Sequence, residues 1–202
     1  MCGRFEGYFP ENKMANPFEN LFDNLVIDDV EDDELKIFDI RPTNKIKCIF
    51  RDGENRFMTN ATWGIQFSPK SHLIINSRIE TIREKPFWFR SFDKNRALVP
   101  MSAFYEWVTI GGKKKQQRIY IEGVDIFYVP SIYHKKNNEL FVSFITVPSN
   151  KFMKKLHPRM PVILMGEQAI NYLTDEVEAN LAKCKSLPDD VTMNRESFKA
   201  KK

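Results

Sequence analysis

The sequence predicts an α+β fold, in which a single domain has a strand-rich curved sheet or open barrel-like core and a few peripheral helices. Short runs of alternating apolar and polar residues, separated by Gly, Pro, Asn and Asp, recur along most of the chain, as is typical of strands and hairpins. Only a few segments have the spacing of an amphipathic helix. The 202 residues can bury a core without disulfides and show no repeat or linker. We therefore expect one domain over residues 1–198 and a disordered basic tail over 199–202.

The order of the elements follows from these patterns. A short amphipathic helix is predicted to run from Asn16-Pro17, a favoured N-cap and first helical residue, to Leu25, and a solvated acidic loop is expected at 28–34. Lys113–Lys115 are expected in a loop after Gly111-Gly112. Strands are predicted in the apolar runs 35–40, 46–50, 56–58, 63–65, 73–76, 97–100, 103–109, 119–129, 140–147 and 161–166. Further helices are predicted at 77–85, ended by Pro86, at 149–156, with Ser149 as N-cap, and at 168–173 and 176–184.

The charge distribution is compatible with a polyanionic partner. The net charge is +4, but residues 28–34 hold six acidic side chains and no basic one. The rest of the chain therefore carries 31 basic residues against 21 acidic ones, a net charge of +10. A basic body of this kind suits nucleic acid, although basic surfaces are common in other proteins as well.

Composition also limits the setting of the protein. The content of 42% hydrophobic and 29% charged residues is typical of a soluble globular protein, and no apolar stretch approaches the ~18 residues that span a bilayer. No signal peptide is recognisable, so a cytoplasmic location is expected. The three cysteines, Cys2, Cys48 and Cys184, form no C-x-x-C pair and are odd in number, so neither a metal site nor a disulfide framework is expected. Cys48 lies in an apolar run and is expected to be buried.

Cys2 is the first candidate for chemistry. A small second residue favours removal of Met1, after which Cys2 carries a free amine and a free thiol. An N-terminal amine titrates near ~7.7–8.0 and a free thiol near ~8.5, so a minority of each is nucleophilic at neutral pH. An aldehyde condenses with such an amine to an imine, and the thiol then closes onto the same carbon to give a thiazolidine ring. The alternative is that Cys2 is an incidental residue beside the initiator methionine.

Three further polar residues lie in apolar or turn contexts. Asn76 ends an apolar run. Glu106 lies between two aromatic residues, which makes it a candidate for the raised pKa of a general acid or base; the alternative is a strand glutamate that faces water on the side opposite the rings. His157 stands before a proline at a predicted helix end, where the alternative role is a C-terminal helix cap.

Several short motifs resemble those of the SOS response-associated peptidase (SRAP) family. They occur in the family's order and span residues 1 to about 165. The motifs are Met1-Cys2-Gly3-Arg4-Phe5, Trp63-Gly64, Asn76-Ser77-Arg78-Ile79-Glu80-Thr81, Leu98-Val99-Pro100 with Phe104-Tyr105-Glu106-Trp107, and His157-Pro158-Arg159-Met160-Pro161-Val162-Ile163-Leu164. Each motif alone is weak, whereas five in the right order are specific.

The resemblance implies a DNA damage response protein that crosslinks covalently to abasic sites in single-stranded DNA through its N-terminal cysteine. It also implies autoproteolytic exposure of Cys2 and, through the same imine, lyase activity. The family's catalytic positions fall on Cys2, Asn76, Glu106 and His157. In this assignment His157 assists opening of the closed deoxyribose, Glu106 moves protons during imine formation and reversal, and Asn76 orients the amine. No cofactor or metal is implied, and the expected protein is a monomer that joins the nucleoid when bound to DNA.

The resemblance also suggests which residues contact DNA. Arg4, Arg78 and Arg159 are expected to do so, the first two by binding phosphates, which fixes the register without reading sequence. Trp63 and Phe67 are candidates for stacking on bases next to the lesion, with core packing as an equal alternative. Trp107 is a third candidate for stacking, but core packing is the favoured interpretation for it.

The chain departs from the family in three places. Residues 65–69 replace the usual Pro and second Trp, so Phe67 is the candidate substitute for that ring. Ala103 stands where a Gly is common, and Pro130-Ser131-Ile132 where Ala-Gly-Leu is usual. None of these changes removes a proposed catalytic group.

Two functions from other classes stay open at this point. A thiol peptidase would use Cys2 with His157 as its base. A reader of modified DNA or RNA would use the same groove without covalent chemistry and would keep full binding after Cys2→Ala.

Overall fold

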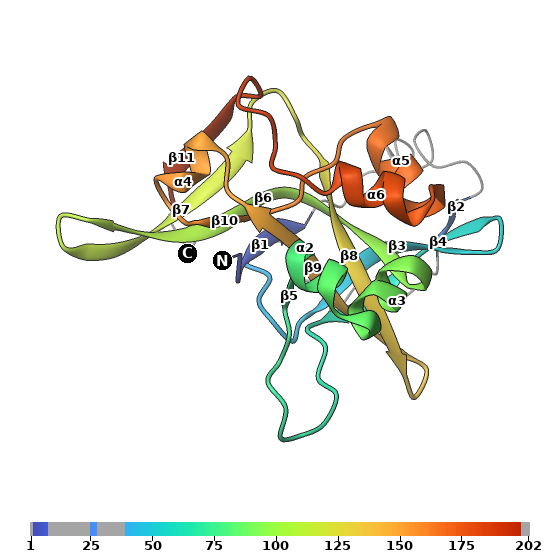
Figure 1. Cartoon of the computed structure of the whole chain (residues 1–202). Coiled ribbons are helices and arrows are strands. Elements are labelled where there is room, and N and C mark those ends of the chain that lie inside the picture. Colours follow the sequence, from blue (N-terminus) through green and yellow to red (C-terminus); the bar gives the residue numbers. More distant parts are fainter. Residues whose placement is uncertain (1, 8–24, 28–38, 199–202) are drawn as a thin grey trace.

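The computed structural model describes residues 2–7, 25–27 and 39–198. In these residues the strands join into one mixed sheet that curves on itself, with helices around it (Figure 1). The strands are β1 (Phe5–Gly7), β2 (Leu25–Ile27), β3 (Lys45–Asp52), β4 (Asn55–Trp63), β5 (Asn76–Arg78), β6 (Arg96–Ile110), β7 (Lys113–Ile121), β8 (Phe127–Lys136), β9 (Glu139–Pro148), β10 (Arg159–Pro161) and β11 (Met193–Ser197). The helices are α2 (Ile79–Glu84), α3 (Pro86–Lys94), α4 (Lys151–Lys154), α5 (Glu167–Thr174) and α6 (Val177–Lys183). The predicted α+β class with a strand-rich curved core is confirmed.

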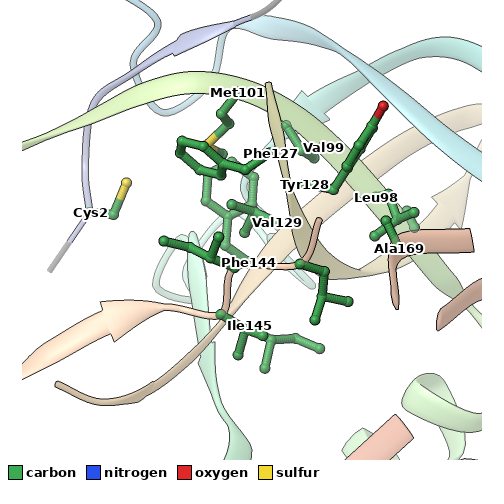
Figure 2. Close-up of a cluster of buried hydrophobic side chains, with 14 of the residues drawn as sticks. Cys2, Leu98, Val99, Met101, Phe127, Tyr128, Val129, Phe144, Ile145 and Ala169 are labelled. Carbon is green, nitrogen blue, oxygen red and sulfur yellow. The ribbon is translucent and has the colours of Figure 1, made fainter. Parts of the chain in front are cut away.

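The pairings of the central strands run in a ring. β3 pairs with β4 and β6, β4 with β9, β9 with β8, and β8 with β6. β1 lies along β6, and β5 runs parallel to β9. Apolar side chains fill the interior, and Figure 2 shows Cys2 at one side of this buried cluster. The largest side chains in the core are Trp63, Tyr128, Tyr172, Phe5, Phe92, Phe104, Phe127 and Phe144.

Strand β6 organises the fold and differs from the prediction of two separate runs. It is one strand of 15 residues that passes through Pro100. Its partner changes along its length, because residues 96–101 pair with β8 and residues 104–110 with β7. Pro100 lies next to this change of partner, where a missing amide hydrogen disrupts little of either ladder.

The lysines at 113–115 lie in a strand, so the predicted loop there was wrong. Gly111 and Gly112 have φ angles of +58° and +74°, and they alone reverse the chain. Two consecutive residues with positive φ make a tight hairpin turn whose twist matches that of the flanking strands. Lys113 therefore pairs directly with Ile110, and the ladder continues from there.

Other element boundaries in the structure differ from the predicted ones. Pro86 ends α2 as predicted but also occupies the first turn of α3, which was not predicted. Asn150, rather than Ser149, caps α4, because its side chain accepts a hydrogen bond from the Met153 amide. The run 119–129 holds two strands and a turn, and β11 was not predicted. The strand predicted at 161–166 was wrong, because β10 shares only Pro161 with it.

Several predictions fall outside the described residues. They are the helix begun at Asn16, the acidic loop 28–34, most of the strand at 35–40 and the tail 199–202. Leu25, the predicted end of that helix, lies instead in β2, which pairs in parallel with β4.

Candidate functional site

Three of the four predicted catalytic residues meet where the N-terminal segment crosses the sheet. Cys2 precedes β1, Asn76 begins β5, and Glu106 lies on β6. The Asn76 side chain donates a hydrogen bond from Nδ2 to the Cys2 carbonyl oxygen at 2.9 Å. The Tyr105 amide donates to the Arg4 carbonyl oxygen at 2.9 Å, so the first residues lie along β6 at the level of Glu106.

The Cys2 thiol is enclosed by protein. Its residue is 0% exposed, and its Sγ contacts the Arg4 carbonyl oxygen at 3.7 Å. Burial, and then the negative charge of Glu106, raise the pKa of Cys2 to about 12. The thiol is therefore protonated at neutral pH and needs a base before it can attack. Glu106 is the neighbouring carboxylate that can serve as that base.

Glu106 does not face water, so the structural alternative considered for it is wrong. It is 4% exposed, whereas the next residue, Trp107, is 58% exposed. Core packing was the favoured interpretation for Trp107, and it was wrong as well. A cavity of about 220 Å³ opens beside these two residues; its other lining residues are Gly3, Arg4, Arg41, Tyr105 and Gln116.

Asn76 is positioned by hydrogen bonds to the backbone of the residue before it. The carbonyl oxygen of Ile75 accepts hydrogen bonds from the Trp63 indole Nε1 at 3.0 Å and from the Phe144 amide at 3.1 Å. Trp63 is 0% exposed and stacks on Phe144 with ring centroids 4.6 Å apart. In this structure no face of Trp63 is open to a DNA base, and the core-packing alternative holds. No local signal at Phe144 reveals this supporting role, because it depends on the pairing of β5 with β9.

His157 lies at the end of α4. Its amide donates to the Met153 carbonyl oxygen at 2.8 Å, and its ring Nδ1 accepts from the Arg159 amide at 3.0 Å. The same Nδ1 also lies 3.1 Å from the Arg159 carbonyl oxygen, so the Arg159 backbone fixes the position of the ring. Among the described residues no hydrogen bond joins the His157 ring to Cys2 or Asn76.

The three predicted arginines differ in availability. The Arg4 side chain is 13% exposed and forms an ion pair with Asp39, with Nε 2.5 Å from Oδ1. Its Cζ also lies 4.2 Å from the centroid of the Phe198 ring. Arg159 is 15% exposed and binds Glu80 through two hydrogen bonds of 2.7 and 3.0 Å. Arg78 is exposed, and its side chain forms no hydrogen bond to another described residue. It is therefore the arginine most open to a ligand.

Phe67 lies on the surface, as base stacking requires. It is 40% exposed and contacts three other rings, with centroid distances of 5.2 Å to Phe87, 6.1 Å to Trp88 and 5.4 Å to His134. These rings come from α3 and β8, so the surface loop after Trp63 packs on both elements. The sequence did not reveal this group because its members are far apart in the chain.

The described part of the chain offers no obvious metal site, since no three His, Cys, Asp or Glu side chains gather in it. The described helices are too short or too polar to cross a membrane. Cys48 is 1% exposed, which confirms its predicted burial.

Comparison with other proteins agrees with the geometry. The family model for the SOS response associated peptidase (SRAP) matches residues 1–199. The chain is similar to the abasic site processing protein YoaM of Bacillus subtilis, with 30% identity over 86% of this chain and 79% of that protein. It is also similar to the abasic site processing protein YedK of Escherichia coli, with 24% identity over 90% of this chain and 83% of that protein.

Solved structures share the fold. A Bordetella bronchiseptica protein superimposes with a TM-score of 0.79 at 17% identity, over 98% of this chain and 100% of that protein. A Bacteroides thetaiotaomicron protein does so with a TM-score of 0.69 at 22% identity, over 81% of this chain and 78% of that one. Because the family model spans residues 1–199, almost the whole chain, this chain belongs to the SRAP family.

Proposed function

We propose that this protein processes abasic sites in DNA and bonds covalently to them through Cys2 once Met1 has been removed. The observation that carries the proposal is the junction of Cys2, Asn76 and the buried Glu106 beside an open cavity. The abasic site processing relatives support it.

The chemistry begins with the amine of Cys2, because the thiol is protonated at neutral pH. The amine adds to C1′ of the ring-opened abasic sugar, and loss of water gives an imine. The thiol sulfur then adds to the imine carbon while its proton passes through Glu106 to the imine nitrogen, which closes a thiazolidine. Asn76 fixes the Cys2 backbone through its carbonyl oxygen, so the amine is presented in one orientation.

DNA contacts in this proposal come from the exposed groups around the site. Arg78 follows Asn76 by two residues and is free to bind a phosphate. His157 opens the closed sugar in this proposal, and lyase activity follows by β-elimination from the same imine.

The thiol peptidase alternative is less well supported. Such an enzyme activates its cysteine as a thiolate through a neighbouring histidine. Here the pKa of Cys2 is raised to about 12 by burial and by Glu106, which opposes thiolate formation. Among the described residues no imidazole forms a hydrogen bond with Cys2.

The proposal is tested with untagged protein and single-stranded DNA that carries one abasic site, on a denaturing gel. We expect a heat-stable shifted band for the wild type and for the matched control Cys48→Ala, whose thiol lies in the core. Cys2→Ala keeps an N-terminal amine but loses the thiol, so its adduct should survive only after borohydride reduction. Glu106→Gln should slow crosslinking by about 10²–10⁴-fold, as is usual for loss of a general acid or base.

An uncleaved extension before Cys2 turns its amine into an amide and should abolish the band. A heat-stable band from such an extended protein would falsify the thiazolidine chemistry. Equal bands with undamaged DNA would instead show that the aldehyde is not the target.

A further inference from the structure

The hairpin that continues from Glu106 reaches beyond the core. It comprises residues 107–116, the last part of β6 and the first part of β7, and is called here the hairpin arm. Figure 1 shows it projecting away from the body of the molecule. Phe104 and Glu106, just before the arm, are 0% and 4% exposed, whereas Trp107 and Ile110 within it are 58% and 40% exposed.

The register of the arm assigns each residue to a face. Cross-strand partners share a face in an antiparallel pair, and successive residues alternate between faces. Lys115 pairs with Val108, and Lys113 with Ile110, so both lysines share the face of Glu106. Lys114 pairs with Thr109 and lies on the opposite face with Trp107. The two-residue turn at Gly111 and Gly112 fixes this register. A shift of one residue would move each lysine to the opposite face.

The Glu106 face of the arm alternates cationic and apolar groups. Lys113 and Lys115 are exposed and form no ion pair with a described residue, while Val108 is half-buried and Ile110 is 40% exposed. At about 3.3 Å per strand residue, Lys115 lies about 7 Å and Lys113 about 13 Å along the hairpin from Glu106. Lysines that only protect a strand edge from aggregation can lie on either face, so that role does not explain why two of them lie on the face of Glu106.

This combination suits a nucleic-acid strand better than a folded protein. A strand offers regularly spaced phosphates to the lysines and sugar or base surface to the apolar side chains. The surplus of 31 basic over 27 acidic residues also favours a polyanion.

We propose that Lys113 and Lys115 bind the phosphates of the DNA strand that flanks the abasic nucleotide, so that the Glu106 face of the arm is a track for that strand. The proposal rests on the proposed function for the position of the lesion. The binding surface itself does not depend on the covalent step.

The test measures non-covalent binding of a fluorescent single-stranded oligonucleotide without abasic sites, by anisotropy, across a series of NaCl concentrations. For single strands, each phosphate contact contributes about 0.7 to the slope of log affinity against log salt. The double variant Lys113→Gln/Lys115→Gln should therefore lower the slope by about 1.4. Lys115→Gln should lower it by about 0.7, and Lys114→Gln, which removes the same charge from the other face, by clearly less.

Thermal melting should be unchanged in all three variants, since the lysines are exposed. The inference fails if the double variant keeps the wild-type slope, if Lys114→Gln matches Lys115→Gln, or if the wild type does not bind the oligonucleotide. It fails too if poly-glutamate displaces the oligonucleotide at equal charge concentration, since any anion would then serve.

The two proposals can fail separately. Wild-type protein that binds the oligonucleotide with the predicted slopes but forms no crosslink to abasic DNA would remove the proposed function and leave the track. Normal crosslinking with unchanged slopes in the variants would remove the track alone.

Discussion

At the scale of single residues, a buried acid anchors the strand that follows Cys2. Glu6 on β1 is 9% exposed in its side chain and accepts hydrogen bonds of 2.9 and 3.0 Å from Arg118 on β7. It also accepts from Tyr105 on β6. Burial by itself would raise the pKa of Glu6, but the hydrogen bonds from Arg118 and Tyr105 outweigh it, so the pKa lies below its ordinary value. The ion pair thus holds the N-terminal segment against two strands.

Loss of this carboxylate should destabilise the protein in a pH-dependent way. Because the folded pKa of Glu6 is depressed, its contribution is present above the unfolded pKa of ~4.3 and is lost as the pH falls through the folded pKa. Glu6→Gln should cost about 2 kcal/mol at pH 7, or about 4–8 °C in Tm, and the gap from wild type should narrow towards pH 3.

Melting curves of both proteins from pH 7 to pH 3 measure the effect. Glu196→Gln is the matched control, because Glu196 binds the same arginine at 3.2 Å but is 56% exposed, and it should change Tm far less. A gap for Glu6→Gln that stays constant down to pH 3 would contradict the assignment.

At the scale of elements, the turn from β4 into the surface loop depends on Gly64. Its φ angle is +120°, and a Cβ added there would lie 2.6 Å from Leu73 Cδ1. Only glycine adopts this backbone region readily. The turn begins the segment that connects Trp63 to Asn76, so a change in its backbone can shift the position of Asn76.

Gly64→Ala should therefore destabilise the protein by about 1–3 kcal/mol, as expected for backbone strain, in chemical denaturation. Gly123→Ala is the control, since Gly123 also has a positive φ, of +70°, but has no atom within 4 Å of an added Cβ. It should cost less, about 1 kcal/mol. Equal losses for the two variants would show that the contact with Leu73 is unimportant.

At the scale of the whole molecule, Arg159 connects parts of the chain that lie far apart in the sequence. Besides Glu80 on α2, it donates to the Thr146 carbonyl oxygen on β9 at 2.6 Å. It therefore joins β10, and the segment of His157 before it, to the elements that follow Asn76. This is a structural role that the expectation of a DNA contact did not include.

Arg159→Gln should lower stability by about 1–2 kcal/mol, a discounted value because Glu80 is 46% exposed. Arg78→Gln, at an exposed arginine, should leave Tm unchanged and weaken binding of single-stranded DNA instead. Melting and anisotropy on both variants separate the roles. If Arg159→Gln left Tm unchanged and only weakened DNA binding, Arg159 would be a DNA ligand and not a tie between elements.

The sequence singled out residues that lie together in the fold, but it did not predict how their surroundings are packed. Motif order identified Cys2, Asn76 and Glu106, which the fold brings together. It did not predict that Trp63 would be buried or that Trp107 would be exposed, because the two rings have similar local contexts and differ only in which strands cover them. The helix α3 was missed because Pro86 was interpreted only as a helix end, although proline also suits a first turn.

The sequence by itself determined the α+β class and the chemical character of Cys2, because alternation and an N-terminal thiol are local properties. The tertiary structure alone decided the protonation of that thiol, the support of Asn76 by Trp63 and Phe144, and the shared face of Glu106, Lys113 and Lys115. Burial, strand pairing and register arise from contacts between distant segments, and such contacts are not written in any one stretch of the chain.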